Sequence, residues 1–125
     1  MPTDLHVVAV IGEDHVVYRA VETDDCEAPA LVDSFKSSYE LGIPPRRWSP
    51  EERFRVIHMG ISCFSTARQA EKVAVRWGKG DYIAQLCLPA DEGFSFARWG
   101  SRGHMTVWGD PLKLSETAVD IVRIQ

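Results

Sequence analysis

The sequence lacks the features that mark membrane, nucleic-acid-binding and disulfide-stabilised proteins. No apolar run approaches the roughly 20 residues of a membrane-spanning helix, and no signal peptide is expected, because no basic region precedes an apolar stretch near the N-terminus. The net charge of −4 makes nucleic-acid binding an unfavoured function. Cys26, Cys63 and Cys87 are odd in number and widely spaced, which argues against a disulfide framework. These absences favour a cytoplasmic protein of bacterial type.

Signatures of metal and nucleophile sites are also missing. The histidines and cysteines form no Cys-x-x-Cys or His-x-x-x-His pair, so no metal site is expected. The run Gly60-Ile-Ser-Cys-Phe64 differs from the Gly-x-Ser-x-Gly nucleophile elbow, because no second glycine allows the sharp turn. Acidic residues interleave with a basic cluster around Trp48, so a solvated face is favoured there over a docking surface; the cluster is Arg46, Arg47, Arg53 and Arg55.

The apolar content of 45% in 125 residues predicts one domain, residues 1–125, with a single core. Runs rich in β-formers predict strands at Leu5–Ile11, His15–Val21, Tyr82–Leu88, Phe94–Trp99, His104–Trp108 and Ala118–Ile124. Gly12 suits the turn of a hairpin between the first two strands. The last strand is apolar on both faces, which predicts a central, buried position.

Three helices are predicted from apolar spacing and capping patterns. Leu31, Phe35 and Tyr39 lie four residues apart, which predicts a helix over about 30–41, and Ser49-Pro-Glu-Glu52 predicts a second over about 50–58. The capping box Thr66-Ala-Arg-Gln69 predicts a third helix that ends at Gly78. Because helices come early in the chain and strands late, the expected class is α+β.

Arg19 interrupts the apolar run His15–Val21, and an arginine in such a strand needs a partner or an open cleft. Its guanidinium suits a phosphate or a carboxylate. The alternative is an arginine at a sheet edge that faces water or pairs with Glu22 or Asp24.

Hydroxyl and imidazole groups lie beside other predicted strand ends. Ser62, Ser65 and Thr66 precede the third helix, whose N-terminus favours an anion, although Ser65 and Thr66 are better explained as helix caps. His104 opens a strand and can act as acid, base or donor near neutral pH, or can be a structural histidine. Asp110 is expected to cap the segment after that strand.

Taken together, these motifs resemble the ADP-ribosyltransferase-like fold. Tyr18-Arg19 resembles the aromatic and basic pair that contacts NAD at the end of an early strand in that family. Gly60–Ala74 is similar to the strand, Ser-Thr element and helix that hold the nicotinamide end. Gly103–Pro111 resembles the strand that opens with the catalytic glutamate, and also the ending of a group of small uncharacterised bacterial proteins.

The resemblance implies an ADP-ribosyltransferase-like split β-sheet core with about three helices, with NAD as substrate and no metal. It implies catalytic roles for His104 and Ser62, and the residues implied to bind the cofactor are Arg19, Tyr18, Ser65, Thr66 and Thr106. His104 stands where the family has its glutamate and carries no negative charge, so transfer should be slow. Otherwise Glu92 or Asp110 should act as the acid, or the substrate should be a phosphorylated ribose.

Three hypotheses follow from the sequence. The first is an NAD-handling protein, such as a toxin-like effector, that transfers ADP-ribose or cleaves NAD. The second is a non-catalytic member of the same fold that binds a nucleotide or a protein. The third is an interaction protein, such as a toxin–antitoxin component. The first two expect Arg19, Ser62 and His104 to converge within about 10 Å in one cleft.

Overall fold

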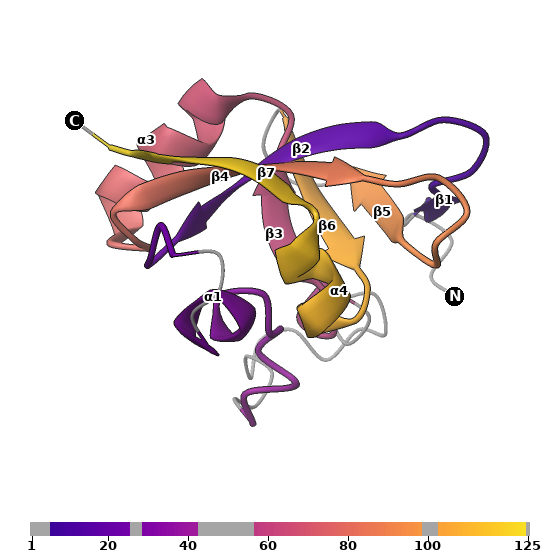
Figure 1. Ribbon diagram of the computed structural model, residues 1–125, viewed down its shortest axis with the longest axis horizontal. Helices are drawn as coiled ribbons and strands as arrows, with labels where there is room; N and C mark the ends of the chain where they lie inside the picture. The colour runs from indigo at the N-terminus through magenta and orange to yellow at the C-terminus, as the bar shows by residue number, and fades with distance from the viewer. Residues whose placement is uncertain (1–5, 26–28, 43–56, 99–102, 125) are drawn as a thin grey trace.

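The computed structural model describes residues 6–25, 29–42, 57–98 and 103–124. In these residues one antiparallel sheet has the strand order β1-β5-β6-β3-β2-β4-β7 (Figure 1). The strands are β1 (Val8–Ala9), β2 (His15–Val21), β3 (Ile61–Phe64), β4 (Tyr82–Leu88), β5 (Ser95–Arg98), β6 (His104–Trp108) and β7 (Ala118–Arg123). The helices of this part are α1 (Pro29–Asp33), α3 (Ala67–Trp77) and α4 (Pro111–Glu116). The α+β class predicted from the sequence is confirmed.

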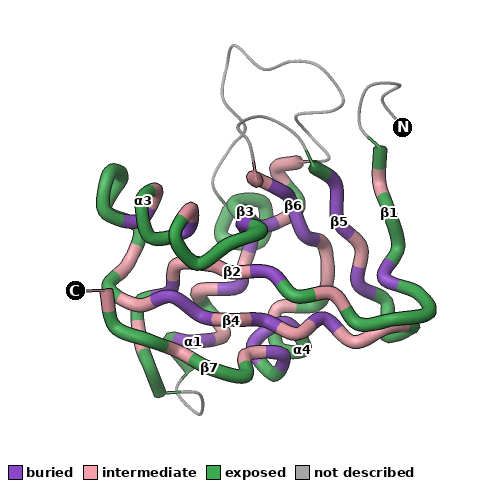
Figure 2. The backbone as a smooth tube through the Cα atoms, turned by 90° about the horizontal axis from the view of Figure 1, so that it is seen from above, coloured by how far each residue is buried: buried purple, intermediate pink, exposed green. Residues whose placement is uncertain are grey.

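Helices cover both faces of the sheet. Helix α3 lies on one face and contacts β2, β3 and β4, while α1 and α4 pack together on the opposite face (Figures 1 and 2). The α3 face has a small core that includes Phe64, Ala70 and Ile83. The opposite face carries the larger core, to which α1 contributes Leu31 and α4 contributes Leu114. None of the described helices is long and apolar enough to cross a membrane.

Helix α3 begins and ends where its sequence predicts. The Thr66 hydroxyl accepts a hydrogen bond from the Gln69 amide (3.2 Å), and Gly78 ends the helix in the left-handed conformation, with φ of 62°. The alanines of its inner face, Ala70 and Ala74, are buried and let the helix approach the sheet closely. Local capping and apolar spacing therefore suffice to define this element.

The predicted helix over 30–41 is wrong in its length, because α1 ends at Asp33. The chain then starts a new turn at Ser37, whose amide donates to Glu40 Oε1 (2.8 Å), while the Glu40 amide donates to Ser37 Oγ (3.2 Å). This reciprocal pair is a capping box, which marks a helix start and interrupts the preceding helix. Leu31 and Phe35 are nevertheless fully buried. Most of the helix predicted over 50–58 lies outside the described residues.

Two predictions about strand neighbours are wrong. Strand β1 pairs with β5, through Val8 and Phe96, and forms no hairpin with β2. Strand β7 is at an edge of the sheet and pairs with β4, although its sequence predicted a central position. Val119 and Val122 of β7 are 62% and 55% exposed. The apolar composition of a strand shows only that the strand can be buried. The position of the strand in the sheet depends on distant parts of the chain.

Candidate functional site

Ser62 and His104 come together on neighbouring strands. Strands β3 and β6 pair so that Ser62 faces Thr106 and Phe64 faces His104. Because alternate residues of a strand share a face, these side chains lie on the α3 side of the sheet. His104 Nε2 lies 3.2 Å from Ser62 Oγ, and the edge of the His104 ring contacts Phe64, with ring centroids 5.3 Å apart. Ser62 is exposed, so its hydroxyl remains accessible to a ligand.

The N-terminus of α3 lies beside this pair, and its first turn is closed by the side chain of Gln69. Both Ser65 Oγ and Thr66 Oγ1 donate to Gln69 Oε1 at 3.0 Å. The Ser65 amide donates to the Gly103 carbonyl at 2.9 Å, immediately before His104. The capping role expected for Thr66 is confirmed, and the Ser65 hydroxyl is used within the same first turn. The sequence signal for Gln69 was its position in the capping box.

Arg19 points to the opposite face of the sheet, so the expected convergence of Arg19, Ser62 and His104 in one cleft is wrong. Its Nε donates to the Ser34 carbonyl (2.9 Å) and its Nη1 to the Ser62 carbonyl (2.6 Å). Strands β2 and β3 share one registered pair, Tyr18 with Phe64. The guanidinium thus joins β3 to the segment after α1. It does so where β2 and β3 share a single registered pair and form few backbone hydrogen bonds with each other.

The surroundings of Arg19 are apolar. Burial lowers the pKa of Arg19, and burial raises the pKa of the neighbouring Cys63 thiol to about 12. Neither expected alternative holds for this arginine, because it donates to two carbonyl oxygens on the buried side of the sheet and forms no ion pair with Glu22 or Asp24. With its donors turned away from His104, it acts as a structural tie rather than as a neighbour of the Ser62–His104 pair.

Tyr18 and Thr106 lie on the same face of the sheet as the pair, and Thr106 is buried. Tyr18 is half-buried and packs with Phe64 against the small core beneath α3. Thr106 is 1% exposed and lies directly opposite Ser62. Ser62, Ser65 and Thr66 are exposed and His104 is half-buried, so these residues carry the accessible polar atoms of the predicted site, whereas Thr106 is covered.

Neither carboxylate suggested as a replacement for the family's glutamate lies beside His104. Asp110 caps α4, where its Oδ2 accepts a hydrogen bond from the Lys113 amide (3.1 Å). Glu92 precedes β5, and the first residue of β5, Ser95, pairs with Trp108 at the far end of β6. The expectation that one of these acids serves the site is wrong for this arrangement.

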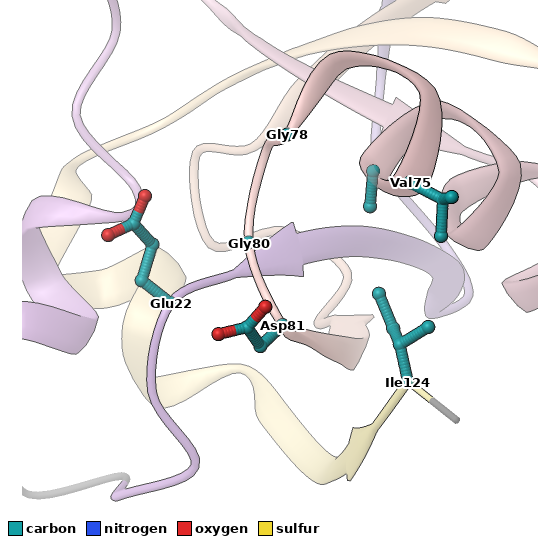
Figure 3. Close-up of a pocket in the computed structure, with 7 residues that line it drawn as sticks. Glu22, Val75, Gly78, Gly80, Asp81 and Ile124 are labelled. Carbon is teal, nitrogen blue, oxygen red and sulfur yellow. The ribbon is translucent and has the colours of Figure 1, made fainter.

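A hollow of about 380 Å³ lies at the other end of α3. Figure 3 shows two carboxylates near one end of this hollow and aliphatic side chains near the other; its lining consists of Glu22, Ala74, Val75, Gly78, Gly80, Asp81 and Ile124. None of the site residues predicted from the sequence lines it. Across the described ranges, no group of three or more histidine, cysteine or acidic residues is placed to hold a metal ion.

Comparison with known proteins gives no match. No family model matches the chain, and no curated protein or solved structure matches it. The geometry of the described residues is therefore the basis for any functional proposal.

Proposed function

We propose that the protein binds a ribose-containing nucleotide at the Ser62–His104 pair, with NAD as the ligand implied by the resemblance to the ADP-ribosyltransferase-like fold. The observation that carries this proposal is the contact of 3.2 Å between His104 Nε2 and the exposed Ser62 hydroxyl. A serine hydroxyl both donates and accepts, and a neutral imidazole offers one donor and one acceptor. Such a pair can match the two adjacent hydroxyls of a ribose.

The first turn of α3 supplies the second part of the proposed site. Helix N-termini carry unpaired amide donors and a partial positive charge, which favour a phosphate group. The Ser65–Gly103 backbone hydrogen bond of 2.9 Å holds this terminus next to the start of β6. The proposed ligand would place its ribose on Ser62 and His104 and its pyrophosphate toward Thr66 and the helix end.

Within this proposal, binding without transfer is the better-supported function. The oxocarbenium-like charge of ADP-ribose transfer needs a preorganised negative charge. The resemblance puts His104 in the place of that glutamate, while Asp110 is used in a cap and Glu92 lies at the far end of β6. Arg19 lies on the other face and supports the strands instead of the phosphate. The proposed compartment is the cytoplasm, in keeping with free Cys63 and Cys87.

Isothermal titration calorimetry with NAD tests the proposal. We expect saturable binding by the parent protein and at least tenfold weaker binding by Ser62→Ala and by His104→Ala. Ser38→Ala and His6→Ala are matched controls, because both positions are exposed and lie outside the site; they should bind as the parent does.

Two outcomes would change the conclusion. A parent protein that binds neither NAD nor ADP-ribose would refute the nucleotide proposal and favour the interaction-protein hypothesis. Release of free nicotinamide that depends on His104 would show that the protein is catalytic, and the transfer hypothesis would then replace the binding one.

A further inference from the structure

Strand β7 leaves an open edge that has the composition of a buried strand. The Ile124 amide donates to the Asp81 carbonyl (2.8 Å), so residues 120, 122 and 124 direct their backbone groups toward β4. Ile121 and Arg123, at the alternate positions, therefore direct theirs outward. Native edge strands are protected by charged residues, lysine above all, by proline or by a covering element. β7 has no lysine or proline; its charged residues are Asp120 and Arg123, and Val122 is 55% exposed.

The hollow at the end of α3 meets this edge at Ile124, on the α3 side of the sheet. We use the word trough for this hollow, lined by Glu22, Val75, Asp81 and Ile124, together with the side chains that continue from it along α3 and β7, which are Glu71, Asp120 and Val122. Val75 is 68% exposed and lines the hollow together with Ile124 (Figure 3). Glu71 lies one helical turn before Val75 on the same flank. Asp120 shares a face with Val122, because the two are separated by one residue of a strand.

Two acidic residues, Glu22 and Asp81, line the hollow (Figure 3). They adjoin Val21 and Tyr82, the last registered pair between β2 and β4, so both lie at the same end of the sheet. Two negative charges in one hollow favour a cationic ligand. The last turn of α3 adds negative potential from its free carbonyl groups.

Arg68, Lys72 and Arg76 lie along α3, but no basic side chain of the described residues forms an ion pair with Glu22 or Asp81. The ion pair found within the described ranges is between Lys36 and Asp33, at 2.8 Å. Lys79 stands between Gly78 and Gly80 without forming an ion pair with Glu22 or Asp81. Arg123 lies on the other face, where it donates to the Tyr82 hydroxyl at 3.3 Å.

We propose that the trough binds a basic, extended segment of a partner protein, which adds to the sheet as a strand beside β7. Backbone hydrogen bonds to Ile121 and Arg123 would provide affinity, as in other cases of strand addition. Lysine or arginine side chains on one face of the segment would reach the carboxylates of the trough. Their aliphatic stems would cover Val75 and Val122.

A second copy of this chain is a poorer occupant on charge grounds. If β7 paired antiparallel with β7 of another copy, the helices α3 of both copies would lie on the same face. The beginning of one β7 would then oppose the end of the other. Asp120 of each copy would then lie on the side of its partner that carries Asp81 and Glu22, which adds negative charge to a region that already holds two carboxylates.

A labelled peptide tests the proposal directly. The probe is a fluorescein-labelled seven-residue peptide of alternating lysine and threonine, and the control probe has glutamate in place of lysine. Fluorescence anisotropy should show saturable binding of the lysine peptide alone. The double variant Glu22→Gln, Asp81→Asn should bind it at least tenfold more weakly. Asp24→Asn, Glu116→Gln changes net charge equally at two exposed positions outside the trough and should retain binding.

Amide hydrogen exchange separates strand addition from simple charge attraction. Peptide binding should slow exchange at the Ile121 and Arg123 amides. Binding that leaves both amides unchanged, or that falls equally in the two double variants, would overturn the proposal. Protection of these amides by dimerisation without peptide, seen by sedimentation velocity, would also overturn it in favour of a second copy. These outcomes are independent of NAD binding at Ser62 and His104.

Discussion

Replacing Arg19 by methionine should destabilise the protein without acting through the proposed ligand site. The change keeps an aliphatic stem but removes the hydrogen bonds to the Ser34 and Ser62 carbonyls. Hydrogen bonds from a charged donor contribute about 1.5–3 kcal/mol each, which gives roughly 3–6 kcal/mol for the two. Loss of the half-buried guanidinium also removes its desolvation cost, which offsets several kcal/mol. We therefore expect a net decrease of about 1–3 kcal/mol in the free energy of unfolding.

Urea unfolding followed by circular dichroism measures this difference. Arg19→Lys is the informative companion, because a single ammonium group cannot reproduce the fork that reaches both carbonyls; it should recover less than half of the loss. NAD binding by the folded fraction of Arg19→Met should match that of the parent. If Arg19→Met is as stable as the parent but no longer binds NAD, the structural role assigned to Arg19 is refuted. Arg19 would then be a ligand-binding residue.

Three further substitutions test local features. Burial lowers the pKa of His15, whose ring stacks on Phe96 with centroids 4.3 Å apart and whose Nε2 has no partner. As pH falls, His15 is therefore protonated in the unfolded chain before it is protonated in the folded protein. The free energy of unfolding should decrease as pH drops through about 6.5. The difference between the urea midpoints at pH 7.5 and pH 5.5 should be smaller in His15→Phe than in the parent protein. Thr66→Ala removes the cap that accepts the Gln69 amide and should cost about 1 kcal/mol in urea unfolding. Gly103→Ala places a methyl group against the Gln69 amide at φ of 81°; it should lower stability by about 1–3 kcal/mol, and an unchanged thermal midpoint would contradict the close approach.

Elements that depend on nearby residues could be predicted from the sequence. Helix α3 is an example, because its cap at Thr66, its inner alanines and its stop at Gly78 all act over one or two turns. Strand β2 was predicted with its observed ends, His15 and Val21, from composition and flanking turn residues. The break after α1 was equally local, since Ser37 and Glu40 form a capping box that the apolar spacing obscured.

The contact between Ser62 and His104 was expected from the sequence, and the position of Arg19 was not. The hydroxyl of Ser62 and the imidazole of His104 were chosen from their positions at strand ends, and their contact follows from the β3–β6 register. Arg19 was chosen because an arginine in an apolar strand needs a partner. The sequence does not give the face on which that partner lies, because the Ser34 and Ser62 carbonyls are 15 and 43 residues away.

The sequence by itself determined the α+β class, the caps of α3 and most strand segments, since hydrogen bonds and side-chain periodicity within a few residues decide these features. Tertiary structure alone decided that β1 pairs with β5, that β7 lies at an edge, and that Arg19 and His104 occupy opposite faces. Strand order depends on which of several distant segments pair with each other, and that choice depends on the packing of the complete core. An apolar strand such as β7 is compatible with a central or an edge position, and its neighbours determine which one it takes.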